Sequence, residues 1–223
     1  QDEIFQNGVT QDYRLTLSGG SDKIQYLVSG NFTGEDGVVI ENNNKRYQAR
    51  ANITSQLTNW LHLTADVNAS HNVRKSANFN TGKDNIVNIA MNYAPVLGIM
   101  NDDGTYVRDN YSALTQLNPV GLLKEQMGES MTDIVNARID LKFDILPGLT
   151  FTTSNGIDYN DLKGYSFGTK KVDSKSSMGN NDAYRMTLQT TNNFTYTGKW
   201  GDHALTATAV YEATQSEYRY LSV

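Results

Sequence analysis

Charged side chains that could support chemistry recur at every second position of several segments. In the stretch NARIDLKFDI, residues 136–145, they alternate with apolar side chains; the charged ones are Arg138, Asp140, Lys142 and Asp144. Asp66 and Asp158 occupy matching positions elsewhere. A glycoside hydrolase needs two carboxylates at a defined separation across its substrate. Basic residues interleave with these acids, namely Arg46, Arg50, Arg138, Arg185 and Lys142, so cross-strand ion pairs are the simpler interpretation and no enzyme is predicted.

A second set of candidates lies in the segment 74–130. The tetrad Asn101, Asp102, Asp103 and Gly104 could hold Ca²⁺ through oxygen atoms, but it lacks the distal Glu of a calcium loop, and the same residue types form turns. Tyrosines in this segment could stack on sugar rings or simply pack locally. The predicted ligand-binding residues are Tyr93, Asp102, Asp103, Tyr106 and Tyr111.

Other chemistries have little support. The chain has no Cys, and His62, His71 and His203 are too scattered to form a metal site, so we expect no metal and no cofactor. No phosphate loop, nucleophile elbow or zinc motif is present. The 24 acidic residues outnumber the 19 basic ones, which argues against nucleic acid as a partner. No apolar run approaches the roughly 20 residues of a membrane-spanning helix.

Period-two alternation indicates the elements that carry these side chains. It predicts about eight long strands, at residues 11–18, 23–34, 45–57, 61–73, 136–145, 149–165, 184–197 and 203–220. The connections alternate between short and long. Short ones fall at 18–22, 57–60, 146–148 and 198–202, and long ones at 35–44, 74–130 and 163–182. A transmembrane barrel sorts its turns in this way, whereas a soluble sandwich has no reason to.

The barrel interpretation also predicts which face meets lipid. The apolar face of 136–145 would face lipid and the charged face the lumen, because a basic side chain near the midplane of the bilayer costs about 2–4 kcal/mol. The predicted lumen-lining residues are Arg46, Arg50, Asp66, Arg138, Asp140, Lys142 and Asp144. Trp60 and Trp200 adjoin short turns, while Tyr47 and Tyr159 lie toward the long loops, as two interfacial aromatic girdles require.

The longest connection, 74–130, is predicted to contain two short helices. The first begins at DNIVNIAMNYAP, with Asp84 as N-cap and Pro95 as its stop. The second begins at NPVGLLKEQMG, with Asn118 as cap, Pro119 at the first helical position and Gly128 past its end. If the short turns are periplasmic, both chain ends lie on the extracellular side, so we expect residues 1–223 to be an internal section of a larger barrel domain.

Several segments resemble the first part of the barrel in the SusC/RagA family of TonB-linked outer-membrane transporters. They are QDEIFQNG, YRLTLSGGSDKIQYLVSGNFTGEDGVV and RYQARANITSQLTNWLHLTADVNAS, with VLGIMNDDGTYV, LNPVGLL and GKWGDHALTATAVYEAT later in the chain. The resemblance implies a Gram-negative outer-membrane location, a 22-stranded barrel and a plug. It also implies energy from TonB, a SusD-like surface lipoprotein, and glycans or peptides as cargo. The plug, the TonB-contacting part and the closing strands of the family are not among these residues.

Two alternatives remain open at this point. A small structural or adhesive outer-membrane barrel would have eight strands and periplasmic termini. A soluble β-sandwich binding module would expose its polar face to water and need no detergent. The sequence therefore favours an all-β fold, an antiparallel transmembrane barrel section of about eight strands with a long helix-containing extracellular loop.

Overall fold

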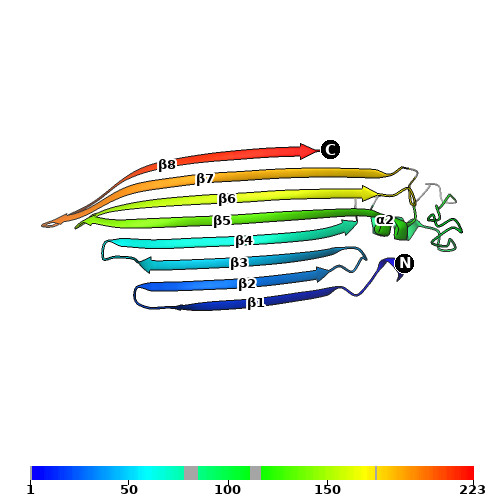
Figure 1. Cartoon of the computed structure of the whole chain (residues 1–223), viewed down its shortest axis with the longest axis horizontal. Helices are drawn as coiled ribbons and strands as arrows, with labels where there is room; N and C mark the ends of the chain where they lie inside the picture. Colours follow the sequence, from blue (N-terminus) through cyan, green and yellow to red (C-terminus); the bar gives the residue numbers. More distant parts are fainter. Residues whose placement is uncertain (1, 78–84, 111–116, 174) are drawn as a thin grey trace.

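The computed structural model describes residues 2–77, 85–110, 117–173 and 175–223. Its strands form one antiparallel sheet in which each strand pairs with the next along the chain (Figure 1). The strands are β1 (Val9–Gly20), β2 (Ile24–Asp36), β3 (Asn43–Gln56), β4 (Leu61–Ala77), β5 (Gln126–Leu146), β6 (Leu149–Gly168), β7 (Ser177–Trp200) and β8 (His203–Ser222). The sheet is open, with β1 and β8 as its two edges. The prediction of eight antiparallel strands is confirmed.

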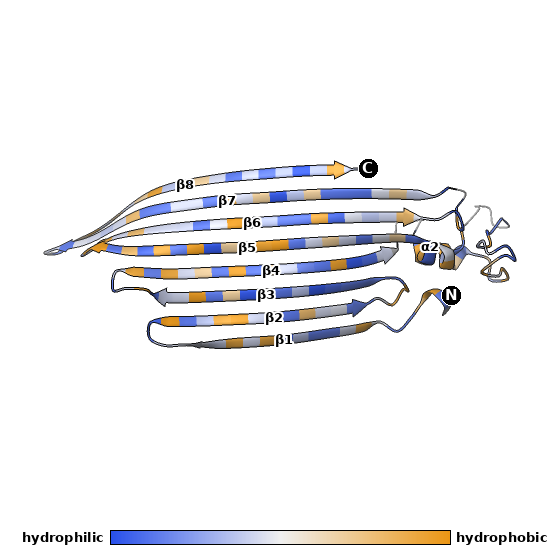
Figure 2. Cartoon of the chain, in the orientation of Figure 1, coloured by the Kyte–Doolittle hydropathy of each residue, from blue (hydrophilic) through white to orange (hydrophobic). Residues whose placement is uncertain are grey.

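The register keeps side chains of one kind on one face. Ala65 of β4 pairs with Ile139 of β5, and the next pair along these strands is Asp66 with Arg138. Because successive side chains point to opposite faces, every strand contributes to both an apolar face and a polar face. Hydrophobic and hydrophilic residues accordingly alternate along the strands in Figure 2. We use the names apolar face, for the side that carries Ile139, and polar face, for the side that carries Arg138.

Several strands are longer than predicted, most of all at the long-loop end. β5 begins at Gln126 rather than near residue 136, and β7 begins at Ser177 rather than near 184. The alternation fades there, but backbone pairing continues, as in Ser76 with Gly128 and Lys75 with Glu129. Ladder hydrogen bonds need no particular side chain, so hydrophobic period alone underestimates the strand.

The alternation of short and long connections is also confirmed. Residues 21–23, 57–60, 147–148 and 201–202 connect strands at one end, and 37–42, 78–125 and 169–176 connect them at the other, which we call the mouth (Figure 1). The short turns use glycine where the backbone is left-handed, with φ of 81° at Gly148 and 57° at Gly201. A side chain is strained in that conformation.

Three short helices lie at the mouth: η1 (Asp2–Ile4), α1 (Ile86–Asn92) and α2 (Pro119–Glu125). The cap of α1 is Asn85, whose side chain accepts a hydrogen bond from Val87 N at 2.9 Å, and not Asp84, which lies outside the described residues. Asn118 caps α2 as predicted, with Pro119 at its first position. None of the helices in the described part of the chain has the length and apolar content to cross a membrane.

The end of α2 differs from the prediction. Gly128 does not follow the helix as a free cap but lies within β5. The reason is that the C-cap, Gln126, already has extended backbone angles, φ −115° and ψ 95°, so the chain passes directly from α2 into β5. This junction fixes the helix to the strand without a flexible linker.

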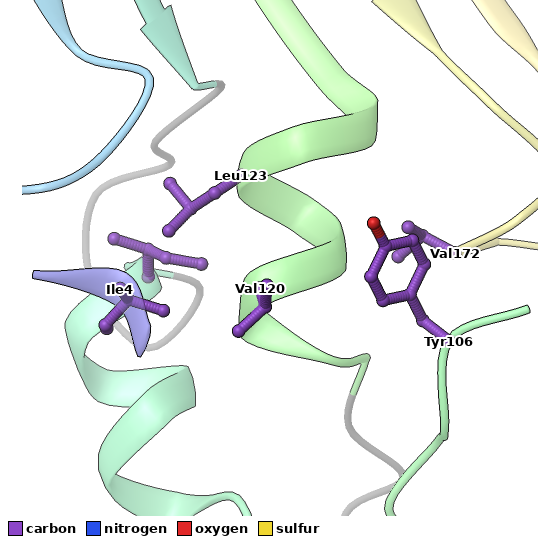
Figure 3. Packing of buried hydrophobic residues seen from close by; sticks show 6 residues of the cluster. Ile4, Tyr106, Val120, Leu123 and Val172 are labelled. Carbon is purple, nitrogen blue, oxygen red and sulfur yellow. The ribbon is translucent and has the colours of Figure 1, made fainter. Parts of the chain in front are cut away.

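The buried core lies at the mouth and not on the sheet. Its members come from the N-terminal segment, the loop 78–125 and the loop 169–176; they are Ile4, Ile86, Tyr106, Val120, Leu123 and Val172. Figure 3 shows Ile4 and Leu123 on one side of α2 and Tyr106 with Val172 on the other. Within the described residues, no second layer covers either face of the sheet. Both faces of the sheet are therefore uncovered by the residues that the structure describes.

Candidate functional site

Two rows of aromatic rings bound the apolar face. The row nearer the mouth runs across β1, β2 and β3 through Tyr13, Phe32 and Tyr47, with ring centroids 6.2 and 5.0 Å apart. The row near the short turns joins Trp60, Phe143, Phe151 and Phe194 at 6.1, 5.8 and 4.6 Å. Trp200 packs on Tyr196 at 6.0 Å, and Tyr159 meets Tyr184 edge-on at 5.6 Å. The rings thus form two rows, as the girdle prediction requires.

The distance between the rows matches a membrane. His71, which packs on Tyr47 at the end of the mouth row, pairs with Asp133 of β5. Roughly ten residue steps separate Asp133 from Phe143, or about 33 Å along the strand. A tilt of about 35–45° shortens this to about 25 Å along the barrel axis, which is the usual height of the lipid-facing band in outer-membrane barrels.

A polar cluster that the sequence reasoning missed interrupts the apolar face. Asn155 Nδ2 donates to Thr153 Oγ1 at 3.1 Å, Thr190 Oγ1 donates to Asn155 Oδ1 at 2.9 Å, and Asn192 Nδ2 donates to Thr190 Oγ1 at 3.2 Å. Register places all four residues beside Ile157, Leu188 and Phe194. The only sequence signal was the weaker alternation of 149–165 and 184–197. Mutual hydrogen bonding lowers the cost of placing these groups in an apolar setting.

The polar face carries every residue predicted to line the lumen. Register places them together on β3, β4 and β5; they are Arg46, Arg50, Asp66, Arg138, Asp140, Lys142 and Asp144. Asn52 donates a hydrogen bond to Asp66, and Asn136 donates to Asp158 at 2.6 Å. These acids are held by amides, in keeping with a structural role. That this face lines a lumen stays a prediction.

The prediction that basic residues of neighbouring strands would pair with the acids of the polar face is mostly wrong. On β5 the pairs form along one strand: Arg138 Nε donates to Asp140 at 2.8 Å, and Lys142 Nζ lies 3.3 Å from Asp144. Side chains two residues apart lie on the same face of a strand, so these pairs form within β5 and do not require an adjacent strand. His62 reaches Asp144 across strands at 3.0 Å.

The remaining predicted basic partners behave differently. Arg185 lies over the ring of Tyr218, 5.6 Å from its centroid. Arg46 and Arg50 face neutral residues and make no ion pair within the described part of the chain. The sequence could not reveal this, because pairing depends on which strand positions become neighbours.

Asn118 organises the loop at the mouth. It is 2% exposed, its oxygen accepts from Val120 N and Gly121 N, and its amide donates to Tyr93 Oη at 3.0 Å and to Ile99 O at 3.2 Å. Tyr93 Oη in turn donates to Val107 O at 2.8 Å. Burial raises the pKa of the Tyr93 hydroxyl. One capping residue therefore connects α2 with two other stretches of the loop.

The Tyr93 ring lines a groove of about 380 Å³ beside α1 and α2. Other lining residues include Ala90, Met91, Leu97 and Pro119. The hydroxyl of Tyr93 is occupied by protein, but its ring is only half-buried. Of the tyrosines predicted to stack on ligand, two lie in the described residues, and Tyr93 is the one of these whose position still permits stacking.

Tyr106 must be corrected from a stacking candidate to a packing residue. It is 8% exposed, and its backbone N–H donates to Lys171 O at 3.0 Å. The ring lies against Gly121 of α2 and Val172. Desolvation by this burial raises the pKa of its hydroxyl. Tyr111, the third candidate, lies outside the described residues.

Asp102 and Asp103 occupy a tight turn. Asp103 Oδ1 accepts from Thr105 N at 2.9 Å and Thr105 Oγ1 at 2.6 Å, and Gly104 has φ 81°. The hydrogen bond from the Thr105 side chain lowers the pKa of Asp103. No group of three His, Cys, Asp or Glu side chains that could hold a metal ion occurs in the described residues. The turn interpretation of this tetrad is the better supported one.

Ion pairs connect the loop 78–125 to the loop between β6 and β7. Lys171 Nζ lies 3.2 Å from Glu125, which also accepts from Thr169 Oγ1 at 2.8 Å, and Arg108 Nη2 lies 3.1 Å from Asp173. The N-terminal segment joins the cap through the connection 37–42, where the Ile40 backbone N–H donates to the Ile4 carbonyl oxygen at 3.1 Å. The mouth therefore carries a folded cap built from four segments of the chain.

An open antiparallel sheet with an apolar band between aromatic rows, a polar opposite face and long loops at one end is the wall of a transmembrane β-barrel. No family model matches the chain. Its sequence is 29% identical over 220 residues to TonB-dependent receptor P3 of Formosa agariphila, covering 95% of this chain and 22% of that protein. It is 26% identical over 195 residues to TonB-dependent receptor SusC of Bacteroides thetaiotaomicron, covering 75% of this chain and 19% of that protein.

Solved structures share the fold. The RagAB peptide importer in its closed-closed state superposes with a TM-score of 0.80 at 19% identity over 99% of this chain and 26% of that chain. The RagAB peptide transporter does so with a TM-score of 0.78. The chain spans about a fifth of the length of the curated relatives that it matches. It is thus homologous to a section of the TonB-dependent receptors of the SusC/RagA type, and the resemblance in its sequence is confirmed.

Proposed function

We propose that residues 1–223 form part of one barrel domain of a TonB-dependent transporter in the outer membrane of a Gram-negative bacterium. The apolar face meets lipid, the polar face lines the lumen, and the mouth with its folded cap faces the cell exterior. The observation that carries this proposal is the apolar band between the two aromatic rows, since its height of about 25 Å suits an outer membrane.

The proposed cargo is an oligosaccharide or a peptide. The RagAB peptide importer supports a peptide, the resemblance to the SusC/RagA family implies glycans as well, and the half-buried Tyr93 ring beside an apolar groove suits either ligand. In the whole protein, a barrel of about 22 strands, a plug reached by TonB and a SusD-like surface lipoprotein would complete the transporter. The section has no catalytic role, and its wall and cap guide the ligand.

Two structural features argue against the alternatives. An eight-stranded small barrel would pair β1 with β8, yet these strands are the two edges of the sheet. A soluble sandwich would cover the apolar face with a second sheet, yet within the described residues Leu15, Ile139 and Val28 are exposed on that face. A continuous exposed apolar surface that extends across several strands marks a protein interface or a membrane-facing surface.

Cysteine labelling on intact cells tests the orientation. The chain has no Cys, so Val96→Cys and Asp202→Cys each introduce one thiol into this section of the full-length transporter. Val96 is 89% exposed in the cap, and Asp202 lies in a short turn. We expect an impermeant maleimide to label position 96 on intact cells and position 202 only after lysis. The reverse pattern would refute the proposed topology.

A further inference from the structure

The arginines and lysines that β1 to β5 place on the polar face fall into two groups. Those of β5 are paired, Arg138 with Asp140 and Lys142 with Asp144. Four arginines of β1, β3 and β4 make no ion pair with any residue that the structure describes, and all four are exposed. We call these four the arginine strip: Arg14, Arg46, Arg50 and Arg74.

Register arranges the strip as a descending series. Arg74 lies nearest the mouth, Arg46 is level with Asn72, Arg14 is level with Ser70 through Asn31 and Gln48, and Arg50 is level with Asn68. Each arginine therefore lies two residues further from the mouth than the one before. Two residue steps are about 7 Å and neighbouring strands about 5 Å apart, so successive Cα atoms in the strip are about 8–12 Å apart.

The surroundings of the strip are polar but mostly neutral. The cross-strand neighbours of its arginines are amides and hydroxyls: Ser29, Asn31, Thr33, Asn44, Asn68 and Asn72. Three acids lie at its edges, Glu35, Asp12 and Asp66; Asp12 already accepts a hydrogen bond from Thr33 at 2.9 Å, and Asp66 accepts one from Asn52. Four guanidinium groups against three carboxylates leave an excess of positive charge, although the whole chain has a net charge of −5.

We propose that the arginine strip binds the carboxylate or sulfate groups of an anionic oligosaccharide that enters from the mouth. Guanidinium forks match planar carboxylates and tetrahedral oxyanions in geometry and charge. The intervening amides and hydroxyls can bond sugar hydroxyl groups as donors and acceptors. An acidic peptide fits less well, because the cross-strand neighbours of the strip in the described part of the chain are polar and do not suit apolar peptide side chains. This inference rests on the proposed function, in that the polar face must line the lumen.

Equilibrium binding to the purified full-length transporter tests the inference. The probes are hexagalacturonate for carboxylates, a sulfated dextran oligosaccharide for sulfates, neutral maltohexaose and a hexa-aspartate peptide. We expect at least one anionic oligosaccharide to bind at low salt and to bind much more weakly in about 0.5 M salt, where the Debye length is only a few ångströms. Arg46→Gln combined with Arg50→Gln should lower that affinity about tenfold or more.

Lys45→Gln provides the matched control. It removes the same charge one residue from Arg46, but Lys45 lies on the apolar side of the sheet, so its loss should leave affinity unchanged. The double variant Arg46→Lys with Arg50→Lys keeps both positive charges but removes the guanidinium forks, so it should bind the anionic oligosaccharide with intermediate affinity. It replaces the glutamine variant in the test if the glutamine variant does not assemble. Heat-modifiability reports assembly of each variant.

Four outcomes would overturn the inference: equal binding of maltohexaose, an equal loss with Lys45→Gln, tighter binding of hexa-aspartate than of both anionic sugars, or no binding of any anionic sugar. Binding to solubilised protein requires no import, so it is independent of the labelling test of topology. If labelling gives the expected orientation and no anionic sugar binds, only the substrate inference fails. If labelling is inverted, the proposed function fails whatever the binding result.

Discussion

Gly121 and Tyr106 are fitted to one another in the cap. A β-carbon placed on Gly121 would lie 2.6 Å from the Tyr106 ring, closer than real contacts allow. The ring is 8% exposed and cannot withdraw toward solvent without leaving the core. The Tyr106 ring can therefore pack against α2 only because residue 121 has no side chain.

The first prediction follows from this fit. Gly121→Ala should loosen the cap, because the clash with Tyr106 outweighs the gain of about 1 kcal/mol in helix propensity. Limited proteolysis of the full-length transporter should cleave the loop 78–125 faster. Gly98→Ala is the control, since nothing lies within 4 Å of the added carbon there. Equal protection of both variants would contradict the packing described for Tyr106.

The second prediction concerns the two faces. Leu141→Arg should impair barrel assembly by about 1–3 kcal/mol, because residue 141 lies on the apolar face between the row at Phe143 and the midplane of the apolar band, where the cost of a basic side chain reaches about 2–4 kcal/mol. Lys142→Leu, one position away on the polar face, should be tolerated better, although it removes the pair with Asp144. Heat-modifiability on gels compares the two. A larger defect for Lys142→Leu would mean that the faces are assigned the wrong way round.

The third prediction concerns the polar cluster on the apolar face. Thr190→Val removes the hydroxyl that bonds both Asn155 and Asn192, so it should destabilise the barrel by about 1–3 kcal/mol. Replacing Thr153, Asn155, Thr190 and Asn192 together by Val, Leu, Val and Leu should restore much of the stability, because no polar member of the cluster is left without its partner.

The control for this cluster is Thr191→Val. Thr191 is next in the chain but lies on the polar face, where its contact with Glu212 is long, at 3.4 Å. We expect a small change in the urea midpoint of unfolding for Thr191→Val and a large one for Thr190→Val. Similar midpoints for the two single variants would show that the cluster is not in an apolar setting.

The fourth prediction concerns ligand capture at the mouth. Tyr93→Ala should weaken binding of the transporter's own substrate, since an aromatic stacking contact contributes about 0.5–1.5 kcal/mol, or a several-fold change in affinity. Tyr93→Phe keeps the ring and loses only the hydroxyl, which bonds to protein, so it should retain affinity. Calorimetry distinguishes them, and unchanged affinity in the alanine variant would leave Tyr93 with a packing role alone.

Much of the wall could be predicted from the sequence because its signals are local. The alternation in NARIDLKFDI determines the two faces of β5, and the turn residues Pro147 and Gly148 end the strand. The Asn118–Pro119 pair begins α2 through a cap that involves only its own first turn. Each of these features depends on residues within a few positions, so no knowledge of the rest of the fold was needed.

Features that depend on distant residues were decided only by the tertiary structure. Tyr106 is a core residue because its ring packs against a glycine of α2. Arg46 does not form the expected ion pair because the strand register places it opposite Thr33 and Asn72. The polar cluster around Thr190 likewise exists only once β6 and β7 are aligned. Strand register and loop packing join residues far apart in the chain, so local pattern constrains the faces of the sheet but not the neighbours within them.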